Sequence, residues 1–295
     1  MPDSDLNPAV VSSVLLKTGE RKMGEILADA GRLKLDEVER ILHLQRDKGL
    51  RFGEAAIQLG IITPADVEYA LSCQFDYPYA VRGERMVGNG LVAAKAPFSP
   101  QVEALRAVRS ELLLRWFNGD PAHKALAVVS AARNEGRSFI AANLAVVFSQ
   151  IGKRTLLIDA DLRNPVQHRL FNLDNGPGLS EILSGRAGPE ANKRVAALRD
   201  LYVLPAGTVP PNPADLLARP PFARLLNELT VYFDCIIVDT PAATASTDAQ
   251  TVAACTGAAL IVARTGDSRI AQLRSVADSL AAARAAVVGT VLNDV

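Results

Sequence analysis

Three groups of polar residues follow apolar stretches of this sequence, and together they could hold a magnesium ion and a phosphorylated ligand. The first group is the run 130–138, Ser-Ala-Ala-Arg-Asn-Glu-Gly-Arg-Ser, which lies between a strand-like stretch and a helix-like one. A loop in that position directs backbone N–H groups and a helix N-terminus at one point, which suits a phosphate. The other two groups are carboxylates, Asp159 with Asp161 and, further along, Asp239.

The run 130–138 matches the Walker A spelling G-x-x-x-x-G-K-[ST] only in part. Gly136 and Ser138 are in place, but Ala131 replaces the first glycine and Arg137 replaces the lysine. Arginine keeps the positive charge, yet a planar guanidinium is not equivalent to a compact ammonium at a phosphate site. We therefore expect Arg137 and the loop amides to hold phosphates, and the arginine to slow phosphoryl transfer more than it weakens nucleotide binding.

The carboxylates each follow a strand-like apolar run. Asp159 and Asp161 follow residues 155–158, and Asp239 follows 233–238 in the form of a Walker B motif. Strand tips are where α/β sheets bind ligands, and Mg²⁺ takes few protein carboxylates together with substrate phosphates. The predicted magnesium ligands, direct or through water, are Ser138, Asp159 and Asp239.

From residue 101 onward, strand-like and helix-like segments alternate, which is the pattern of a mostly parallel α/β sheet flanked by helices. The predicted helices include 101–117, 139–151 and 270–284, and the predicted strands are 126–130, 155–158, 233–238, 258–263 and 287–292. The fold class is therefore α/β, a P-loop sheet preceded by a small all-α domain.

The small domain is predicted from a repeat with an offset of 29 residues (51 − 22 = 29). The repeated polar and glycine positions are Lys22, Gly24 and Gln45 in the first copy and Arg51, Gly53 and Gln74 in the second. The apolar spacing within each copy is helical, and Gly31 and Gly60 lie where a short helix would end. Two copies of one helix pair are expected.

The predicted organisation has four segments: a flexible N-terminus at 1–19, a helical domain at 20–80, a linker at 81–100 and a P-loop domain at 101–295. The 32 basic and 32 acidic residues cancel, so no overall basic field favours nucleic acid as a partner. The sequence shows neither a signal-peptide pattern nor an apolar run of the ~18–20 residues that span a membrane. We expect a cytoplasmic protein that a partner recruits to the inner membrane.

The repeat at 20–80 resembles the N-terminal domain of type II secretion and type IV pilus ATPases. Some members of that family bind cyclic di-GMP through two 24-residue motifs separated by five residues, and the spacing here matches. The resemblance implies a cyclic di-GMP site at the six repeated positions, although Lys22 cannot fork onto guanine or phosphate as arginine does. The other interpretation is that the glycines and apolar positions are structural and that the domain docks a partner.

The loop, Asp159-x-Asp161-x-Arg163 and Asp239-Thr240-Pro241 occur in the order and spacing of bacterial tyrosine kinases, so residues 100–295 resemble that family. The resemblance implies ATP and Mg²⁺ as cofactors. It implies catalytic roles for Asp161, Arg137 and Asp159, with Asp161 as the base that orients the tyrosine hydroxyl. The implied ATP-binding residues are Asn134, Glu135, Gly136, Arg137, Ser138, Phe139 and Asn293.

Upstream of the loop, Glu103, Arg106 and Arg109 share one face of a predicted helix. The same E-x-x-R-x-x-R builds a ring-shaped oligomer in bacterial tyrosine kinases, and a solvated charged face is the alternative. Septum-site and plasmid-partition ATPases share the fold and the Asp-x-Asp, but they carry a signature lysine where this sequence has Ala132.

The two resemblances together match soluble kinases that are paired with exopolysaccharide chain-length determinants. The expected function is an ATP-dependent protein-tyrosine autokinase that regulates exopolysaccharide chain length and export, with a membrane polysaccharide copolymerase as partner. The alternative is a regulatory ATPase module of an export complex that senses nucleotide and cyclic di-GMP without kinase activity. The five tyrosines form no cluster near residue 295, so the sequence does not indicate the phosphoacceptor.

Overall fold

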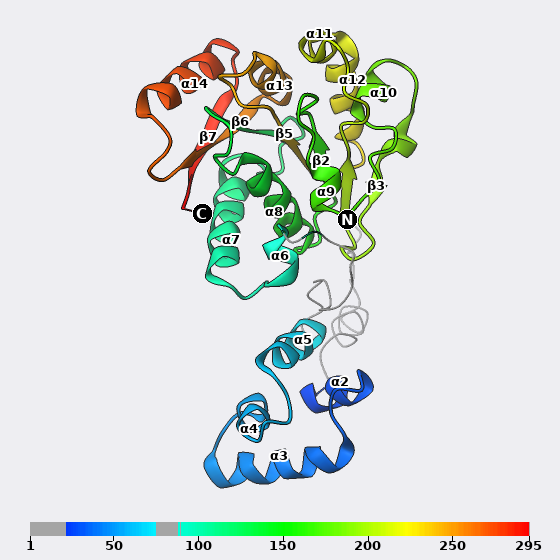
Figure 1. Ribbon diagram of the computed structural model, residues 1–295, viewed down its shortest axis with the longest axis vertical. Helices are drawn as coiled ribbons and strands as arrows, with labels where there is room; N and C mark the ends of the chain where they lie inside the picture. The colour runs from blue at the N-terminus through cyan, green and yellow to red at the C-terminus, as the bar shows by residue number, and fades with distance from the viewer. Residues whose placement is uncertain (1–21, 75–87, 89, 295) are drawn as a thin grey trace, which may run out of the picture. The chain divides into compact units, whose positions relative to one another are not determined.

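The computed structural model describes residues 22–74, 88 and 90–294 (Figure 1). The chain divides into two compact units, one within residues 1–81 and the other within 82–295, and each is described by itself. The segment 1–19, predicted to be flexible, lies outside the described residues. Within the described ranges, no helix has the length and apolar character needed to cross a membrane.

The N-terminal unit consists of two helix pairs that repeat the sequence offset. The first pair is α2 (Met23–Asp29) and α3 (Leu35–Lys48), and the second is α4 (Phe52–Gln58) and α5 (Pro64–Gln74). In each pair the first helix is followed by a glycine in the left-handed region, Gly31 with φ 68° and Gly60 with φ 67°. Glycine adopts this conformation without the steric cost that other residues meet. The prediction of two equivalent helix pairs is confirmed.

Glycines at equivalent positions of α2 and α4 let neighbouring helices pack closely, Gly24 between the two pairs and Gly53 within the second pair. A Cβ added at Gly24 would lie 3.2 Å from the ring of Phe52, and one at Gly53 would lie 3.1 Å from a methyl group of Val67. Both distances are tighter than ordinary van der Waals contact. The two repeated glycines therefore have a structural role in this unit.

The C-terminal unit is a seven-stranded sheet with the order β3-β4-β2-β5-β1-β6-β7. All neighbouring strands are parallel except β3 and β4, which pair antiparallel at one edge. The strands are β1 (Ala125–Ser130), β2 (Thr155–Asp159), β3 (Lys193–Arg194), β4 (Leu201–Leu204), β5 (Cys235–Asp239), β6 (Ala258–Arg264) and β7 (Ala286–Asn293). The predicted α/β class and five strands are confirmed, whereas the short β3 and β4 were not foreseen.

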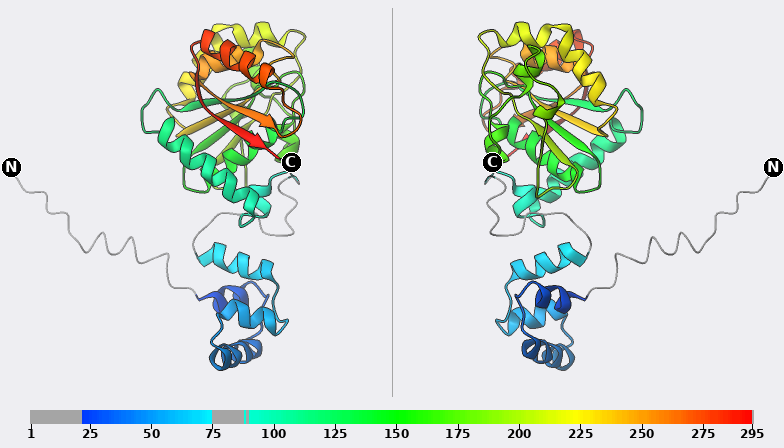
Figure 2. Two further views of the ribbon diagram at one scale, coloured as in Figure 1. Left: turned by 90° about the vertical axis from the view of Figure 1, so that its left-hand side faces the viewer. Right: turned by 90° about the vertical axis from the view of Figure 1, so that its right-hand side faces the viewer.

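Helices cover both faces of this sheet (Figures 1 and 2). On one face lie α6 (Val92–Lys95), α7 (Pro100–Arg115), α8 (Arg137–Ser149) and α9 (Gln167–Leu170). The other face carries α10 (Leu179–Leu183), α11 (Pro213–Ala218), α12 (Pro220–Leu229), α13 (Asp248–Thr256) and α14 (Ile270–Ala282), and a 3₁₀ turn, η1, spans Pro189–Ala191. Helix α8 is buried along its length because it contacts the sheet as well as α6 and α7.

The register of the central strands brings the predicted site residues to one edge of the sheet. Strand β5 lies between β1 and β2, and Asp239 pairs with Val128 on one side and with Asp159 on the other. Parallel strands end at the same edge of a sheet, so the loop after β1 and both aspartate-bearing strand ends meet there.

The described part of the predicted linker 81–100 packs onto α8. Asn143 Oδ1 accepts the Ala93 N–H at 2.9 Å, and Asn143 Nδ2 donates to the Gly90 carbonyl at 2.9 Å. Gln150 Nε2 donates to the Ala93 carbonyl at 2.9 Å. These bonds make this part of the stretch a constituent of the C-terminal unit.

Candidate active site

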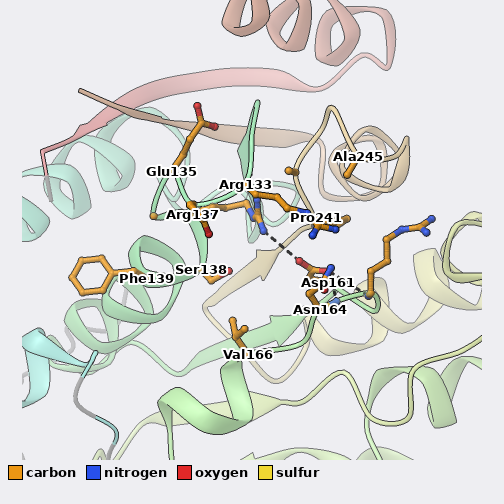
Figure 3. Close-up of a pocket in the computed structure, with 14 residues that line it drawn as sticks. Arg133, Glu135, Arg137, Ser138, Phe139, Asp161, Asn164, Val166, Pro241 and Ala245 are labelled. Atoms are coloured by element: carbon orange, nitrogen blue, oxygen red, sulfur yellow. Dashed lines mark hydrogen bonds and ion pairs between the residues drawn. The ribbon is translucent and has the colours of Figure 1, made fainter. Parts of the chain in front are cut away.

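A pocket of about 390 Å³ lies where the loop after β1 meets the segments after β2 and β5 (Figure 3). Its lining residues are Arg133, Asn134, Glu135, Gly136, Arg137, Ser138, Phe139, Asp161, Arg163, Asn164, Val166, Pro241, Ala242 and Ala245. The six loop residues predicted to bind ATP all belong to this lining, and so does Asp161. Asn293, the seventh predicted residue, does not.

Asn293 instead braces the loop from the end of β7. Its Nδ2 donates to the Glu135 carbonyl at 3.2 Å. Gly136 has φ 88° and a Cβ there would lie 2.1 Å from this amide nitrogen, so only glycine fits. Asn134 also adopts a positive φ, 64°, and the two left-handed residues turn the loop into the N-terminus of α8.

The side chain of Glu135 holds the loop together from inside. It is 1% exposed, its Oε2 accepts the Ala132 N–H at 2.7 Å, and the Ser268 hydroxyl donates to its Oε1. Arg264 Nη1 adds a bond to the Asn134 carbonyl at 3.1 Å. Only the main chain of Glu135 is therefore left for a nucleotide, and Arg264 and Ser268 support the loop without any local sequence signal.

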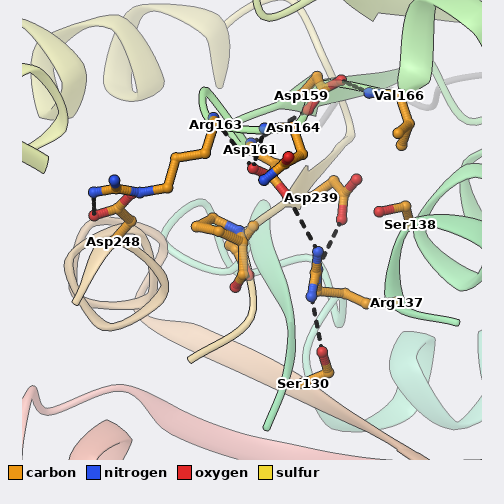
Figure 4. Close-up of polar contacts among 12 residues, drawn as sticks. Ser130, Arg137, Ser138, Asp159, Asp161, Arg163, Asn164, Val166, Asp239 and Asp248 are labelled. Atoms are coloured by element: carbon orange, nitrogen blue, oxygen red, sulfur yellow. Dashed lines mark hydrogen bonds and ion pairs between the residues drawn. The ribbon is translucent and has the colours of Figure 1, made fainter. Parts of the chain in front are cut away.

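Arg137 points into the site, where its guanidinium joins three groups (Figure 4). Nη1 donates to Ser130 Oγ at 2.8 Å, Nη2 to Asp161 Oδ2 at 3.3 Å and Nε to Asp239 Oδ1 at 3.3 Å. The side chain is 9% exposed. A rigid fork of donors can bind several acceptors at once, which an ammonium group does less well. In this state Arg137 is the counter-ion of the two carboxylates.

Asp239, the predicted Walker B carboxylate, is fully buried at the tip of β5. Burial raises its pKa, and this effect is opposed by the charge of Arg137 and by hydrogen bonds from Gln167 and Ser138. The Gln167 bond, from Nε2 to Asp239 Oδ2, is 2.7 Å long. Ser138 and Asp239 are thus neighbours, as the magnesium prediction requires.

Asp159 is also buried, but its oxygens are bound to the backbone of the following loop. Oδ2 accepts the N–H groups of Val166 at 3.0 Å and Gln167 at 2.9 Å, and Oδ1 accepts that of Asp161 at 3.2 Å. Burial and the nearby Asp239 raise the pKa of Asp159 well above its usual range. Asp159 does not line the pocket, so its observed role is to anchor this loop.

Asp161 faces the pocket while its backbone contacts fix its orientation. Oδ1 accepts the N–H groups of Arg163 at 3.2 Å and Asn164 at 2.9 Å, which leaves Oδ2 beside Arg137. The Arg163 side chain turns away to Asp248, with bonds of 2.9 and 3.3 Å. Arg163 therefore connects this loop to the start of α13 while it lines the pocket.

The donor set suits magnesium with a nucleotide. Across the described residues, no group of three or more His, Cys, Asp or Glu side chains could cage a metal ion. Mg²⁺ does not need such a cage, because it keeps several waters and binds one or two carboxylates plus substrate phosphates. The Ser138 hydroxyl and the Asp239 carboxylate are hard oxygen ligands of this kind.

The predicted oligomerisation residues lie on α7. Glu103 and Arg106 form an ion pair one turn apart, with Glu103 largely exposed. Arg109 Nη1 donates to the Val147 carbonyl of α8 at 2.9 Å. Arg109 thus supports packing within the unit, Arg106 is only 17% exposed, and Glu103 is the accessible residue of the motif.

A hollow of about 600 Å³ lies on the N-terminal unit. It is lined by Lys22, Met23, Gly24, Glu25, Ala28, Asp29, Val38, Leu42, Gln45 and Phe52. Of the six residues predicted for cyclic di-GMP, Lys22, Gly24 and Gln45 belong to this lining. Their counterparts Arg51, Gly53 and Gln74 do not.

A loop of left-handed residues between a central strand and a buried helix, opposite a strand ending in aspartate, defines a P-loop nucleotide-binding domain. No protein-family model matches the chain. The tyrosine-protein kinase YwqD of Bacillus subtilis is 35% identical over 212 residues, covering 72% of this chain and 88% of that protein. The chain belongs to the family of bacterial tyrosine-protein kinases.

Solved structures agree with this assignment. The kinase domain of the Escherichia coli tyrosine kinase ETK is 32% identical with a TM-score of 0.68, over 75% of this chain and 86% of that one. The chimerical protein CapA2B2 is 32% identical with a TM-score of 0.65, over 77% and 98%.

Proposed function

We propose that this protein is an ATP-dependent protein-tyrosine kinase, an autokinase that regulates exopolysaccharide chain length and export. Its membership of the bacterial tyrosine-protein kinase family supports the activity. The observation that carries the proposal is Asp161, which lines the same pocket as the phosphate-binding loop and is fixed beside Arg137. A carboxylate in that place can orient a hydroxyl toward a bound phosphate.

Each part of the site has a role in this reaction. The loop amides and Arg137 bind the β- and γ-phosphates of ATP, and Ser138 and Asp239 hold Mg²⁺ directly or through water, with Asp159 supporting them. Mg²⁺ held by these residues would neutralise negative charge that develops on the phosphates. Asp161 accepts the proton of the tyrosine hydroxyl. The tyrosine oxygen forms a bond to the γ-phosphorus as the bond from that phosphorus to ADP breaks. Catalysis of this kind is mainly positioning and charge stabilisation, so few residues suffice.

The test is transfer of label from γ-labelled ATP to the purified full chain, followed by phosphoamino-acid analysis. We expect label on tyrosine in the presence of Mg²⁺. A fluorescent ADP analogue measures binding in parallel. Nucleotide binding without label, both alone and with the membrane partner, would favour the alternative of a regulatory module without kinase activity.

We propose a membrane polysaccharide copolymerase as the partner and a homo-oligomer as the assembled form. The first rests on the family and on the resemblance of the whole sequence to kinases of exopolysaccharide synthesis. The second rests on Glu103, which is exposed on α7 and pairs with Arg106.

Arg137 provides a prediction about the loop itself. We expect Arg137→Lys to lower the stability of the nucleotide-free protein by about 1–3 kcal/mol, because one ammonium replaces a fork bound to Ser130, Asp161 and Asp239. The same change should raise the transfer rate several-fold, because lysine leaves the carboxylates more readily for the phosphates. Thermal melting and label transfer are the measurements. A variant that is as stable as the wild type and slower would contradict both parts.

The hollow on the N-terminal unit favours a second ligand. We propose that cyclic di-GMP binds there, and that Lys22, Gly24 and Gln45 contact it. Calorimetric titration of the full chain should show binding that Gln45→Ala weakens about tenfold, the effect of losing one good hydrogen bond. Gln74→Ala is the matched control, since Gln74 does not line the hollow. If the wild type shows no heat of binding and no thermal shift with cyclic di-GMP, the repeat has only a structural role.

A further inference from the structure

Gln167, the first residue of α9, joins three parts of the active site although it does not line the pocket. It is fully buried. Its Nε2 donates to Asp239 Oδ2 at 2.7 Å and to the Ser138 carbonyl at 3.1 Å. Its backbone N–H donates to Asp159 Oδ2 at 2.9 Å. One residue therefore connects the ends of β2 and β5 to the first turn of α8.

The orientation of the Gln167 amide is fixed by chemistry. Both partners of its terminal nitrogen, a carboxylate and a carbonyl, can only accept hydrogen bonds, so the atom between them must be the NH₂ group. The amide oxygen, Oε1, is buried and has no hydrogen-bond partner among the described residues. A buried, unpaired oxygen costs free energy. Core packing alone does not account for a glutamine here, because an apolar residue would fill the space without this cost.

A neutral donor has a particular advantage at Asp239. Arg137 binds Asp239 Oδ1, and Gln167 binds Oδ2. The two bonds together fix the rotation of the carboxylate. Gln167 does so without adding positive charge, so the negative charge that attracts a cation is kept. A second cationic side chain at this place would cancel that charge, and an apolar one would let the carboxylate rotate.

We propose that Gln167 is a positioning residue of the magnesium site, which holds Asp239 against Ser138 so that both can serve the metal of a bound nucleotide. This inference rests on the proposed function of the same site. Gln167 touches neither the nucleotide nor the tyrosine, and acts through Asp239 and the first turn of α8.

The test uses Gln167→Leu in the full chain, which removes the donor at similar volume. The dissociation constant of a fluorescent ADP analogue is measured in excess Mg²⁺ and in EDTA, and Mg²⁺ is titrated at fixed nucleotide. We expect the Mg²⁺-dependent gain in affinity to fall roughly tenfold, as for loss of a hydrogen bond to a charged group. The affinity in EDTA should stay within about twofold, since the loop amides are unchanged.

Gln150→Leu is the matched control. Gln150 is also buried, and its Nε2 donates to the Ala93 carbonyl at 2.9 Å, away from the pocket lining. Its loss should lower thermal stability without changing the Mg²⁺ titration. Gln167→Asn keeps the amide but shortens the side chain by one methylene, and should reproduce the loss seen with leucine even if the leucine variant folds poorly.

The proposal is overturned if the Gln167 variants retain the Mg²⁺ titration of the wild type, or if they lose affinity equally with and without Mg²⁺, as a packing residue would. Failure of the proposed function looks different. In that case the wild type itself either binds no nucleotide or binds it without transferring label.

Discussion

Replacing Asp161 with asparagine should reduce tyrosine phosphorylation by about 10²–10⁴-fold, the usual contribution of general acid–base catalysis. Asparagine keeps the size of the side chain and can still accept the N–H bonds of Arg163 and Asn164 that orient it. It loses the charge and the basicity that a tyrosine hydroxyl needs. The pocket shape and the loop amides are unaffected, so we expect nucleotide affinity to stay within about threefold, the effect of less than one ordinary hydrogen bond.

Single-turnover transfer of label, with the fluorescent ADP analogue as a binding check, measures both quantities. Asp278→Asn on α14 is the matched control, because Asp278 is exposed and does not line the pocket. Transfer at a rate close to the wild type in Asp161→Asn would show that another group, or solvent, takes the proton. Loss of binding together with transfer would assign Asp161 to the nucleotide instead.

Replacing Asp239 with asparagine should have opposite effects on stability and on function. Three buried carboxylates, Asp159, Asp161 and Asp239, lie close together, and one guanidinium, that of Arg137, pairs with Asp161 and Asp239. Removing one carboxylate relieves this excess of negative charge in the nucleotide-free protein. We expect the melting temperature in EDTA to rise by about 2–4 °C, the shift that ~1 kcal/mol gives in a domain of this size. Affinity for Mg²⁺ with nucleotide should fall about 10–100-fold or more.

The pH dependence has a definite sign. Burial raises the pKa of Asp239 in the folded state above its value of 3.8 in a model peptide, so the folded protein binds more protons than the unfolded chain between these two pKa values. Its contribution to stability is fully present below the unfolded pKa and is lost as pH rises through the folded pKa. Asp239→Asn should flatten this decline.

Melting curves in EDTA from pH 4.5 to 8, with Asp278→Asn as control, test this prediction. A variant that melts below the wild type at neutral pH would mean that the bond from Arg137 outweighs the cost of burying the carboxylate. We expect Asp239→Asn to be more stable but deficient in metal binding, because a functional site that concentrates like charges lowers the stability of the wild-type protein.

Local patterns were sufficient for the two helix pairs and for five of the seven strands of this protein. The 29-residue repeat fixed the two helix pairs because helical periodicity and a glycine after the first helix are properties of adjacent residues. The apolar runs before Asp159 and Asp239 gave β2 and β5 for the same reason. Strands β3 and β4 were not predicted, because two and four residues are too few to show the alternation of a strand.

The carboxyl edge of the sheet was also predictable as the place of the site. Parallel strands expose their ends on one side, so the order of loop, Asp161 and Asp239 along the chain already implied that they meet. The structure confirms their juxtaposition and adds that Asp159 is held by backbone N–H groups outside the pocket lining.

Residue types and their spacing therefore determined the helix pairs, the sheet and the set of charged groups at its edge, because each depends on neighbours in sequence. Tertiary structure decided which of those groups form hydrogen bonds and ion pairs with one another. Arg137 turns to Asp239, 102 positions away, Gln167 reaches the same carboxylate across 72 positions, and Glu135 meets Ser268 across 133. Such pairings depend on side chains that only the folded sheet brings within hydrogen-bond distance, and no local pattern specifies them.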